Sequence, residues 1–276
     1  MNKSIIFLST ILFTQLTFGM ELIPTKYFNP ASYILEEVRL DKYLYVATEH
    51  DKVIFKQALD NAPERIKEII KYKQVFRENI KGELNCLLLT GYTGLGKSVL
   101  AKAIALELGG SCMHLPAGFL FKSHRNETAQ LIHEIIKKSI NELQQVVVII
   151  DDMDVLLQHY NSEYHDSMMT TKVLCKILDE YATNPNFLLI GTAFEPNKIS
   201  PIMMEKFGDN IIELPRPNSL LRKEIIEMYL RNSRTLVDVS VNGYVGDLVN
   251  KTEGFSHRRI LQLMDLADGV AFSKFF

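Results

Sequence analysis

Eight consecutive residues have the types and the order that phosphate chemistry requires: Gly91, Tyr92, Thr93, Gly94, Leu95, Gly96, Lys97 and Ser98. They match the pattern GxxxxGK(S/T), whose glycines let the backbone fold close around phosphate oxygens and offer them N–H groups. Lys97 is expected to reach the β- and γ-phosphates of a nucleoside triphosphate, and the Ser98 hydroxyl is expected to ligate Mg²⁺. We include Val99, the next residue, in the predicted nucleotide-binding segment, where a helix N-terminus would add positive potential.

A second group of chemically competent residues follows the apolar run at residues 146–150. Asp151 and Asp152 come directly after this run, as they would in a strand that ends in carboxylates. At the carboxyl end of a parallel strand, Asp151 would face the Mg²⁺ of the phosphate-binding loop, and Asp152 would orient or activate the attacking water. The alternative is that these acids, together with Asp154, only cap the start of a helix.

Short apolar runs between turn-forming residues predict the strands that must position these groups. They lie at residues 86–90, 146–150 and 187–190, and a last strand is expected at residues 211–214. Patterns with helical periodicity lie between them. Strands that alternate with helices indicate βαβ units and a parallel sheet.

The rest of the chain predicts a helix before the sheet and a separate helical part after it. A helix is expected to begin near Asn61 and to end at Gly82, with one apolar face formed by Ile66, Ile69, Ile70, Phe76 and Ile80. Residues 215–217, Pro-Arg-Pro, break the alternating pattern, and only helix signals follow. The predicted organisation is a leader at residues 1–19, an irregular or partly helical lead-in at 20–60, an α/β nucleotide-binding domain at 61–215 and a helical lid at 216–276.

The composition argues against other kinds of site. A formal net charge of −2 gives no global attraction to nucleic acid or to an acidic membrane surface. An odd number of widely spaced cysteines argues against a disulfide framework and against a zinc site of paired cysteines: Cys86, Cys112 and Cys175. The seven histidines form no HExxH motif. Any metal is therefore expected to arrive with the nucleotide, and nucleic acid is not an expected partner.

From about residue 61 to residue 271, the sequence resembles the ATPase core of the AAA+ family. Five segments in the family's order carry the resemblance: GYTGLGKS, VVVIIDDMD, LLIGTAFEPNKISP, IIELPRP and TEGFSHRRI. The resemblance implies an α/β P-loop NTPase fold, with a parallel five-stranded sheet flanked by helices and followed by a small all-helical lid. It also implies ATP and its product ADP as ligands, a homo-oligomeric ring, and a protein partner that the ATPase remodels. Arg258 and Arg259 lie near the family's sensor-2 region and would reach a phosphate, unless one or both are solvated helix charges.

Three positions depart from the family's pattern. Asp152 stands where a glutamate is common, and its shorter side chain retracts the carboxylate by about one methylene. Phe194 stands at the position of the sensor-1 asparagine and cannot hydrogen-bond a phosphate or a water, although Thr192 is nearby. Lys206 stands where many relatives carry an arginine finger, and it offers a point charge without the planar fork. These departures keep two functions open: an ATPase that remodels a protein, and a nucleotide-binding structural or switch protein with weak hydrolysis.

Two aromatic residues raise the question of a polypeptide pore. Relatives that thread polypeptide carry an aromatic residue on a loop after the second strand, and Phe119 and Phe121 lie in roughly this place. Core packing is favoured over a pore role because aromatic pairs in apolar company are usually buried.

The first 19 residues have the pattern of a secretory signal peptide. One lysine precedes an apolar run at residues 5–18, and residues 17–19 stand where a signal peptidase would cleave. The run is shorter than the roughly 20 residues that span a bilayer, so a membrane anchor is the less favoured alternative, as is a buried N-terminal element. Export conflicts with an ATP site. Three resolutions stay open: an uncleaved tether with a cytosolic core, export into a host or into a lumen that contains ATP, and a leader that only resembles a signal.

Overall fold

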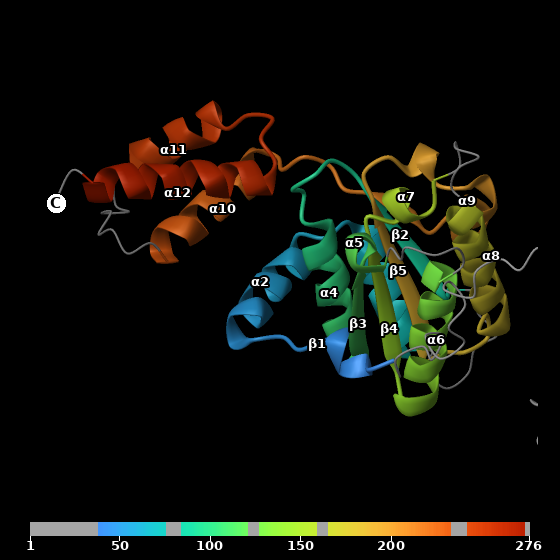
Figure 1. The fold of residues 1–276 in the computed structure, drawn as a ribbon. Helices are drawn as coiled ribbons and strands as arrows, with labels where there is room; N and C mark the ends of the chain where they lie inside the picture. Colours follow the sequence, from blue (N-terminus) through green and yellow to red (C-terminus); the bar gives the residue numbers. More distant parts are fainter. Residues whose placement is uncertain (1–37, 76–83, 121–126, 159–164, 233–241, 274–276) are drawn as a thin grey trace, which may run out of the picture. The chain divides into compact units, whose positions relative to one another are not determined.

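The computed structural model describes residues 38–75, 84–120, 127–158, 165–232 and 242–273. The elements discussed below belong to one compact unit, Arg39–Phe276 (Figure 1). The predicted leader and the aromatic residue Phe121 lie outside the described residues, as do Phe76, Ile80 and Gly82 of the expected first helix. Within the described ranges, no helix has the length and apolar character needed to cross a membrane.

The centre of the unit is a six-stranded sheet with the order β1-β3-β4-β5-β2-β6. Its strands are β1 (Leu44–Tyr45), β2 (Cys86–Thr90), β3 (Ser111–Pro116), β4 (Val146–Asp151), β5 (Phe187–Ala193) and β6 (Ile211–Glu213). Five neighbouring strands of this sheet run parallel, in the order β3, β4, β5, β2 and β6. This confirms the predicted α/β fold with five parallel strands. β1 is an addition to the prediction, because it pairs antiparallel with β3 at the edge of the sheet.

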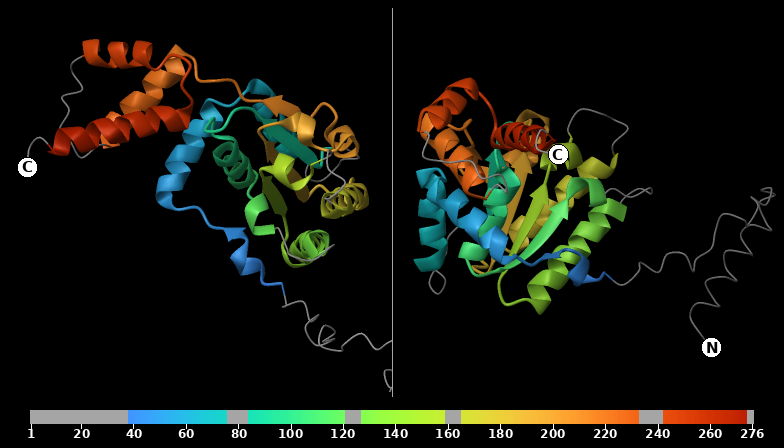
Figure 2. Two further views of the ribbon diagram at one scale, coloured as in Figure 1. Left: turned by 45° about the horizontal axis from the view of Figure 1, so that its top comes forward. Right: turned by 90° about the vertical axis from the view of Figure 1, so that its left-hand side faces the viewer.

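Helices cover both faces of the sheet. They are α2 (Glu49–Asp60), α3 (Glu64–Val75), α4 (Lys97–Glu107), α5 (Ala117–Leu120), α6 (Glu127–Glu142), α7 (Met153–Leu156), α8 (His165–Glu180) and α9 (Pro201–Phe207), with 3₁₀ turns η3 (Leu40–Lys42) and η4 (Pro196–Lys198). The views in Figures 1 and 2 place α4 on one face of the sheet and α6 and α8 on the other. This is the layered arrangement that βαβ units produce when each crossover helix covers the sheet.

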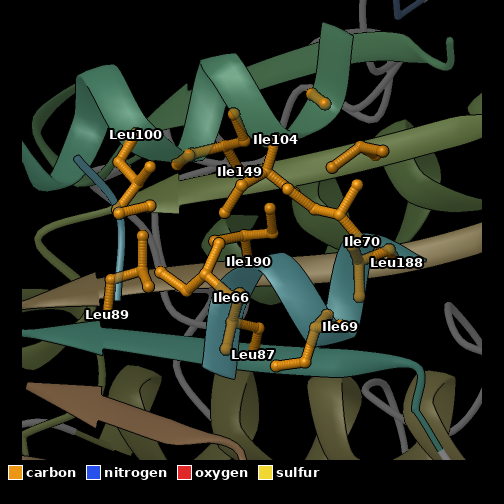
Figure 3. Close-up of a cluster of buried hydrophobic side chains, with 14 of the residues drawn as sticks. Ile66, Ile69, Ile70, Leu87, Leu89, Leu100, Ile104, Ile149, Leu188 and Ile190 are labelled. Atoms are coloured by element: carbon orange, nitrogen blue, oxygen red, sulfur yellow. The ribbon is translucent and has the colours of Figure 1, made fainter. Parts of the chain in front are cut away.

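One face of the sheet forms an apolar core with α3 and α4. Side chains alternate between the two faces of a strand, so every second residue of β2, β4 and β5 points toward these helices. In Figure 3, Leu87, Leu89, Ile149, Leu188 and Ile190 of the sheet meet Leu100 and Ile104 of α4 and Ile66, Ile69 and Ile70 of α3. The predicted apolar face of the first helix is confirmed at these three isoleucines. The packing fixes the end of β2 relative to the start of α4, between which the phosphate-binding loop lies.

The described part of the lead-in before α3 contains a helix, α2, in line with the partly helical alternative of the prediction. Thr48 begins α2 with a capping box: its hydroxyl accepts a hydrogen bond from the Asp51 backbone N–H, and the Asp51 carboxylate accepts one from the Thr48 N–H. This arrangement satisfies two N–H groups that a helix start would leave without partners. Phe55 is the one buried residue of α2, and Ile54, Ala58 and Leu59 are half-buried.

Three helices follow the sheet and share an apolar cluster of their own. They are α10 (Ser219–Asn232), α11 (Asn242–Lys251) and α12 (His257–Ser273). Their cluster consists of Ile225, Ile226, Val245, Val249, Ile260 and Met264. Helices were expected at residues 221–230 and 256–271, and α10 and α12 confirm them. The sequence patterns did not identify α11.

Candidate functional site

The glycine-rich loop bends sharply between β2 and α4. Gly91 has φ of +131°, and a Cβ atom at this position would lie 2.8 Å from the backbone oxygen of Leu214. Gly94 has φ of +81°, and a Cβ atom there would lie 2.8 Å from the Cβ of Arg258 on α12. Both values of φ lie in the region that residues with a side chain rarely adopt. The loop therefore needs glycine at these positions for its bend and for its close approach to neighbouring residues.

Lys97 is the first residue of α4 and is buried. Its ammonium group donates hydrogen bonds to the backbone oxygens of Gly91 at 2.6 Å and of Tyr92 at 3.0 Å. Burial lowers the pKa of Lys97 below its ordinary value, although the charges of Asp152, Asp154 and Asp151 oppose this effect. The loop thus holds a buried cation at its own centre, close to three carboxylates.

The predicted metal ligand Asp151 lies in a row of polar side chains that three adjacent strands form. In β4, Val147 and Ile149 point into the α4 core, so Asp151 continues the same face by strand alternation. Thr192 continues the core face of β5 in the same way, and β3 contributes His114, paired in register with Ile149. The carboxyl ends of parallel strands therefore bring three polar side chains together beside the phosphate-binding loop.

Both carboxylate oxygens of Asp151 have side-chain partners. Oδ1 accepts a hydrogen bond from the Thr192 hydroxyl at 2.8 Å, and Oδ2 lies 2.8 Å from Nε2 of His114. Burial opposes ionisation of Asp151, but its hydrogen bonds with His114 and Thr192, together with the nearby Ser98 hydroxyl, outweigh burial and hold the pKa of Asp151 below its ordinary value. Asp151 is therefore an ionised carboxylate in a fixed orientation. The sequence patterns did not identify His114, and they placed Thr192 only as a neighbour of Phe194.

Asp152 adopts an unusual backbone conformation. Its φ of 56° and ψ of 47° are left-handed, and it is the only non-glycine residue with positive φ in the described part of the chain. Its N–H donates a hydrogen bond to the Thr192 hydroxyl at 3.1 Å. Burial and the charges of Asp151 and Asp154 raise the pKa of its carboxyl group. A group with a raised pKa near an ionised neighbour is the arrangement that general-base chemistry uses.

The alternative that these acids only cap a helix is wrong in this structure. Asp152 occupies the N-cap position of α7 but its side chain makes no capping hydrogen bond. Asp154 is buried, and its Oδ2 accepts hydrogen bonds from the backbone N–H groups of Phe194 at 3.1 Å and Glu195 at 2.7 Å. The other oxygen, Oδ1, is buried without a hydrogen-bond partner. Asp154 therefore fastens the segment after β5 to the segment after β4.

The donor set beside the loop fits Mg²⁺ that arrives with a nucleotide. Among the described residues, no group of three or more His, Cys, Asp or Glu side chains could hold a metal ion by itself. The Ser98 hydroxyl is near enough to Asp151 to help lower the pKa of its carboxyl group, so one hydroxyl and one carboxylate already lie together. Mg²⁺ is usually held by one or two protein oxygens together with substrate phosphates and waters. These two residues match that requirement.

The two lid arginines differ in their surroundings. The backbone N–H of Arg258 donates a hydrogen bond to the Gly94 oxygen at 3.1 Å, so the start of α12 contacts the phosphate-binding loop directly. The charge of Arg258 adds to the effect of burial in lowering the pKa of Lys97, and it partly offsets the raised pKa of Asp152. Arg259 instead lies with its guanidinium 4.3 Å from the centroid of the Phe255 ring within the lid. Arg258 is therefore the better placed of the two to reach a phosphate.

The other departures from the family pattern also have defined partners. Phe194 stacks at a tilt on Tyr92 of the loop, with ring centroids 5.8 Å apart, and the guanidinium of Arg216 lies 4.6 Å from the Tyr92 centroid. Lys206 forms an ion pair with Asp179 of α8 in the same chain. The positions at which the resemblance predicts a sensor-1 asparagine and an arginine finger thus hold an aromatic ring and a lysine with an internal partner.

Phe119 does not pack in the core. Phe119 lies on α5 and is 77% exposed, whereas its neighbour Leu120 is fully buried. The favoured interpretation of Phe119 as a core residue is therefore wrong, because α5 directs Leu120 rather than Phe119 toward the sheet.

Comparison with known proteins gives a consistent result. The family model described as "ATPase family associated with various cellular activities (AAA)" matches residues 87–216. A putative 26S proteasome regulatory subunit homolog of Methanocaldococcus jannaschii is 26% identical over 219 residues, covering 77% of this chain and 57% of that protein. The cell division cycle protein 48 homolog of Archaeoglobus fulgidus is 28% identical over 207 residues, covering 72% of this chain and 27% of that protein. The chain thus spans little more than half of the first relative and about a quarter of the second.

A solved structure supports the fold independently. The crystal structure of the FIGL-1 AAA domain in complex with ADP superimposes with a TM-score of 0.67, at 17% identity, over 89% of this chain and 81% of that one. The segment that matches the family model contains the phosphate-binding loop and the carboxylates that follow β4. The resemblance to AAA ATPases is thus confirmed by the family model over residues 87–216 and by the fold.

Proposed function

We propose that this chain binds ATP with Mg²⁺ at the loop Gly91 to Ser98 and hydrolyses it to remodel a protein partner. The observation that carries the proposal is the position of the ionised Asp151 beside Ser98 and the buried Lys97. A cation, a hydroxyl and a carboxylate in this arrangement are the groups that grip a triphosphate and its metal in P-loop proteins.

Each residue has a defined task in this proposal. The N–H groups of the loop and of the α4 N-terminus bind phosphate oxygens, and Lys97 exchanges its bonds with two backbone oxygens for bonds to the β- and γ-phosphates. Ser98 and Asp151 hold the metal, which, when bound, neutralises charge that develops on the phosphate oxygens. Asp152 accepts a proton from the attacking water, helped by its raised pKa. Arg258 adds positive charge from the lid.

A second function is supported by specific contacts: a nucleotide-binding switch protein that hydrolyses ATP weakly or not at all. Phe194 is held against Tyr92, and Lys206 is paired with Asp179. Neither side chain, in these contacts, offers a free polar group to a γ-phosphate or to a neighbouring subunit. An arginine finger contributes about 10³ to 10⁵ in rate to related hydrolases, so its absence would be large in a rate measurement.

Steady-state phosphate release over a range of protein concentrations separates the two functions. Wild type is compared with Lys97→Ala and with Lys176→Ala, which removes an exposed lysine from α8. Turnover well above that of Lys97→Ala, and equal in wild type and Lys176→Ala, supports the ATPase. Turnover no higher than that of Lys97→Ala, together with calorimetric binding of ATP, supports the switch protein. The absence of ATP binding in wild type would contradict both.

Assembly, partner and compartment are further parts of the proposal. Turnover per chain that rises with protein concentration would support a homo-oligomeric ring whose sites neighbouring copies complete. The exposed Phe119 is available for contact with a polypeptide, which supports a protein as the partner.

For the leader, sequencing of the mature N-terminus decides between cleavage after residue 19, which means export, and retention of residues 5–18 as a tether.

A further inference from the structure

We propose that Thr192 and His114 are positioning residues that clamp the metal-ligating carboxylate of Asp151 from two sides. This inference rests on the proposed function, because it concerns how the same site prepares itself for Mg²⁺ and nucleotide. Its basis is geometric: each side chain binds a different carboxylate oxygen, and each comes from a different neighbouring strand.

The clamp restricts rotation of the carboxylate. A carboxylate that accepts only one hydrogen bond can rotate about the bond to its Cβ, whereas partners at Oδ1 and Oδ2 fix its plane. β4 lies between β3 and β5 in the sheet, so His114 and Thr192 approach Asp151 from opposite sides. An ionised carboxylate accepts about four hydrogen bonds, and two positions therefore stay available for a metal or its waters. Partners of this kind around a metal ligand set its orientation and its affinity for the metal.

Thr192 also fixes the residue that follows Asp151. Its hydroxyl donates its only hydrogen to Asp151 and accepts a hydrogen bond from the Asp152 N–H at 3.1 Å. The left-handed conformation of Asp152 is one that a non-glycine residue keeps only when its surroundings hold it. One hydroxyl thus sets both the orientation of the metal ligand and the direction in which the Asp152 side chain leaves the strand.

The same hydrogen bonds exclude another role for Thr192. A hydroxyl group has one hydrogen, and in Thr192 this hydrogen is engaged with Asp151. Thr192 therefore does not donate to a γ-phosphate in place of the missing asparagine at position 194. Its contribution passes through Asp151 and Asp152.

The test measures how strongly Mg²⁺ improves nucleotide binding. The dissociation constant of a non-hydrolysable ATP analogue is measured by calorimetry with Mg²⁺ and with EDTA, and the ratio of the two constants is compared among variants. Thr192→Val removes the hydroxyl at nearly constant shape, and Thr192→Ser keeps it. His114→Leu removes the second partner, and His114→Gln keeps a nitrogen donor. Thr171→Val is the matched control, because it removes a buried hydroxyl that bonds only the Ser167 oxygen within α8.

Loss of the clamp should weaken metal binding without weakening metal-free binding. Thr192→Val and His114→Leu are each expected to reduce the Mg²⁺-dependent improvement by about 10- to 100-fold, the usual effect of removing a partner of a metal ligand. Thr192→Ser, His114→Gln and Thr171→Val are expected to retain most of the wild-type ratio. A purely structural role would instead lower the melting temperature or both affinities together and would leave the ratio unchanged.

The outcomes separate the clamp from the proposed function. If wild type shows the Mg²⁺ effect and Thr192→Val and His114→Leu retain it, the clamp is wrong and the nucleotide site stands. If both variants lose the effect in a protein that releases no phosphate, the clamp is supported and hydrolysis is not. A wild type that binds the analogue equally well with Mg²⁺ and with EDTA overturns the clamp, and one that binds no nucleotide overturns both proposals.

Discussion

Replacement of Lys73 by methionine is predicted to stabilise the fold at neutral pH. Lys73 lies on α3, and its ammonium group donates a hydrogen bond to the Phe187 backbone oxygen at 3.2 Å. Burial lowers the pKa of Lys73 from 10.5 to about 8, and the nearby Cys86 thiol opposes this shift. The folded state therefore holds the charged form of this side chain at a cost. This destabilising charge lies on α3, a helix that packs against β2, and β2 leads into the phosphate-binding loop.

The size of the effect follows from the two pKa values. The difference between them corresponds to about 3 kcal/mol of unfolding free energy at a pH where the side chain is charged in both states. Methionine avoids this cost and fills similar space, but it loses one hydrogen bond worth about 1 kcal/mol. The expected gain for Lys73→Met is therefore about 1–2 kcal/mol near pH 7.

The sign of the pH dependence provides the sharper test. Because the folded pKa is lower, the unfolded state binds more protons between pH 8 and 10.5, and wild-type stability rises with pH in this window. The advantage of Lys73→Met should be complete below this window and should disappear toward its upper end. Urea unfolding of both proteins at several pH values measures this difference. Lys71→Met, at an exposed position on the same helix, should show no comparable gain. An advantage that persists unchanged through the window would refute the reasoning.

Three further predictions concern the lid and the loop. Arg258→Ala should weaken ATP binding several-fold in calorimetry, whereas Arg259→Ala, which loses only a contact with Phe255 in the lid, should leave it within about twofold. Gly94→Ala should weaken nucleotide binding and lower the melting temperature, because the new Cβ would lie 2.8 Å from the Cβ of Arg258; unchanged binding would show that the loop can shift. Burial lowers the pKa of His257 below 6.5, so its contribution to stability is complete above 6.5 and is lost as pH falls through the folded pKa. His257→Leu should reduce this acid-side loss in urea unfolding, and equal losses in both proteins would contradict the assignment.

The sequence carried enough information to predict the strands that hold the chemistry, because each of them is an apolar run buried on both faces. The runs that became β2, β4 and β5 have this property, and the glycine-rich loop between β2 and α4 was predicted from its GxxxxGK(S/T) pattern. Local patterns of this kind depend only on neighbours in the chain. The orientation of Asp151 toward the loop followed from the same reasoning, since parallel strands end at one edge of the sheet.

The parts that were missed depend on contacts across the sheet. β1 has only two residues, and β3 reads Ser-Cys-Met-His-Leu-Pro, which has neither a clean alternation nor an uninterrupted apolar run. His114 became part of the site only through its register beside β4, which the sequence does not state. Strand alternation extended two residues past Ile190 would have placed Thr192 on the same face as Asp151. The exposure of Phe119 and the ion pair of Lys206 with Asp179 are likewise properties of packing and not of residue type.

The two halves of the site differ in how completely they are built. On the metal side, Asp151 has partners at both oxygens, Asp152 is held in a left-handed conformation, and Asp154 ties the two strand ends together. At the two positions that the family resemblance assigns to contacts with the γ-phosphate, Phe194 is 44% exposed and Lys206 is engaged within its own chain. Interactions made equally with the ground state and the transition state strengthen binding without raising the rate constant of hydrolysis. A site with a rigid metal ligand and few polar groups around the reacting phosphate is therefore expected to bind ATP tightly and to hydrolyse it slowly, unless a neighbouring copy or a protein partner supplies the missing charge.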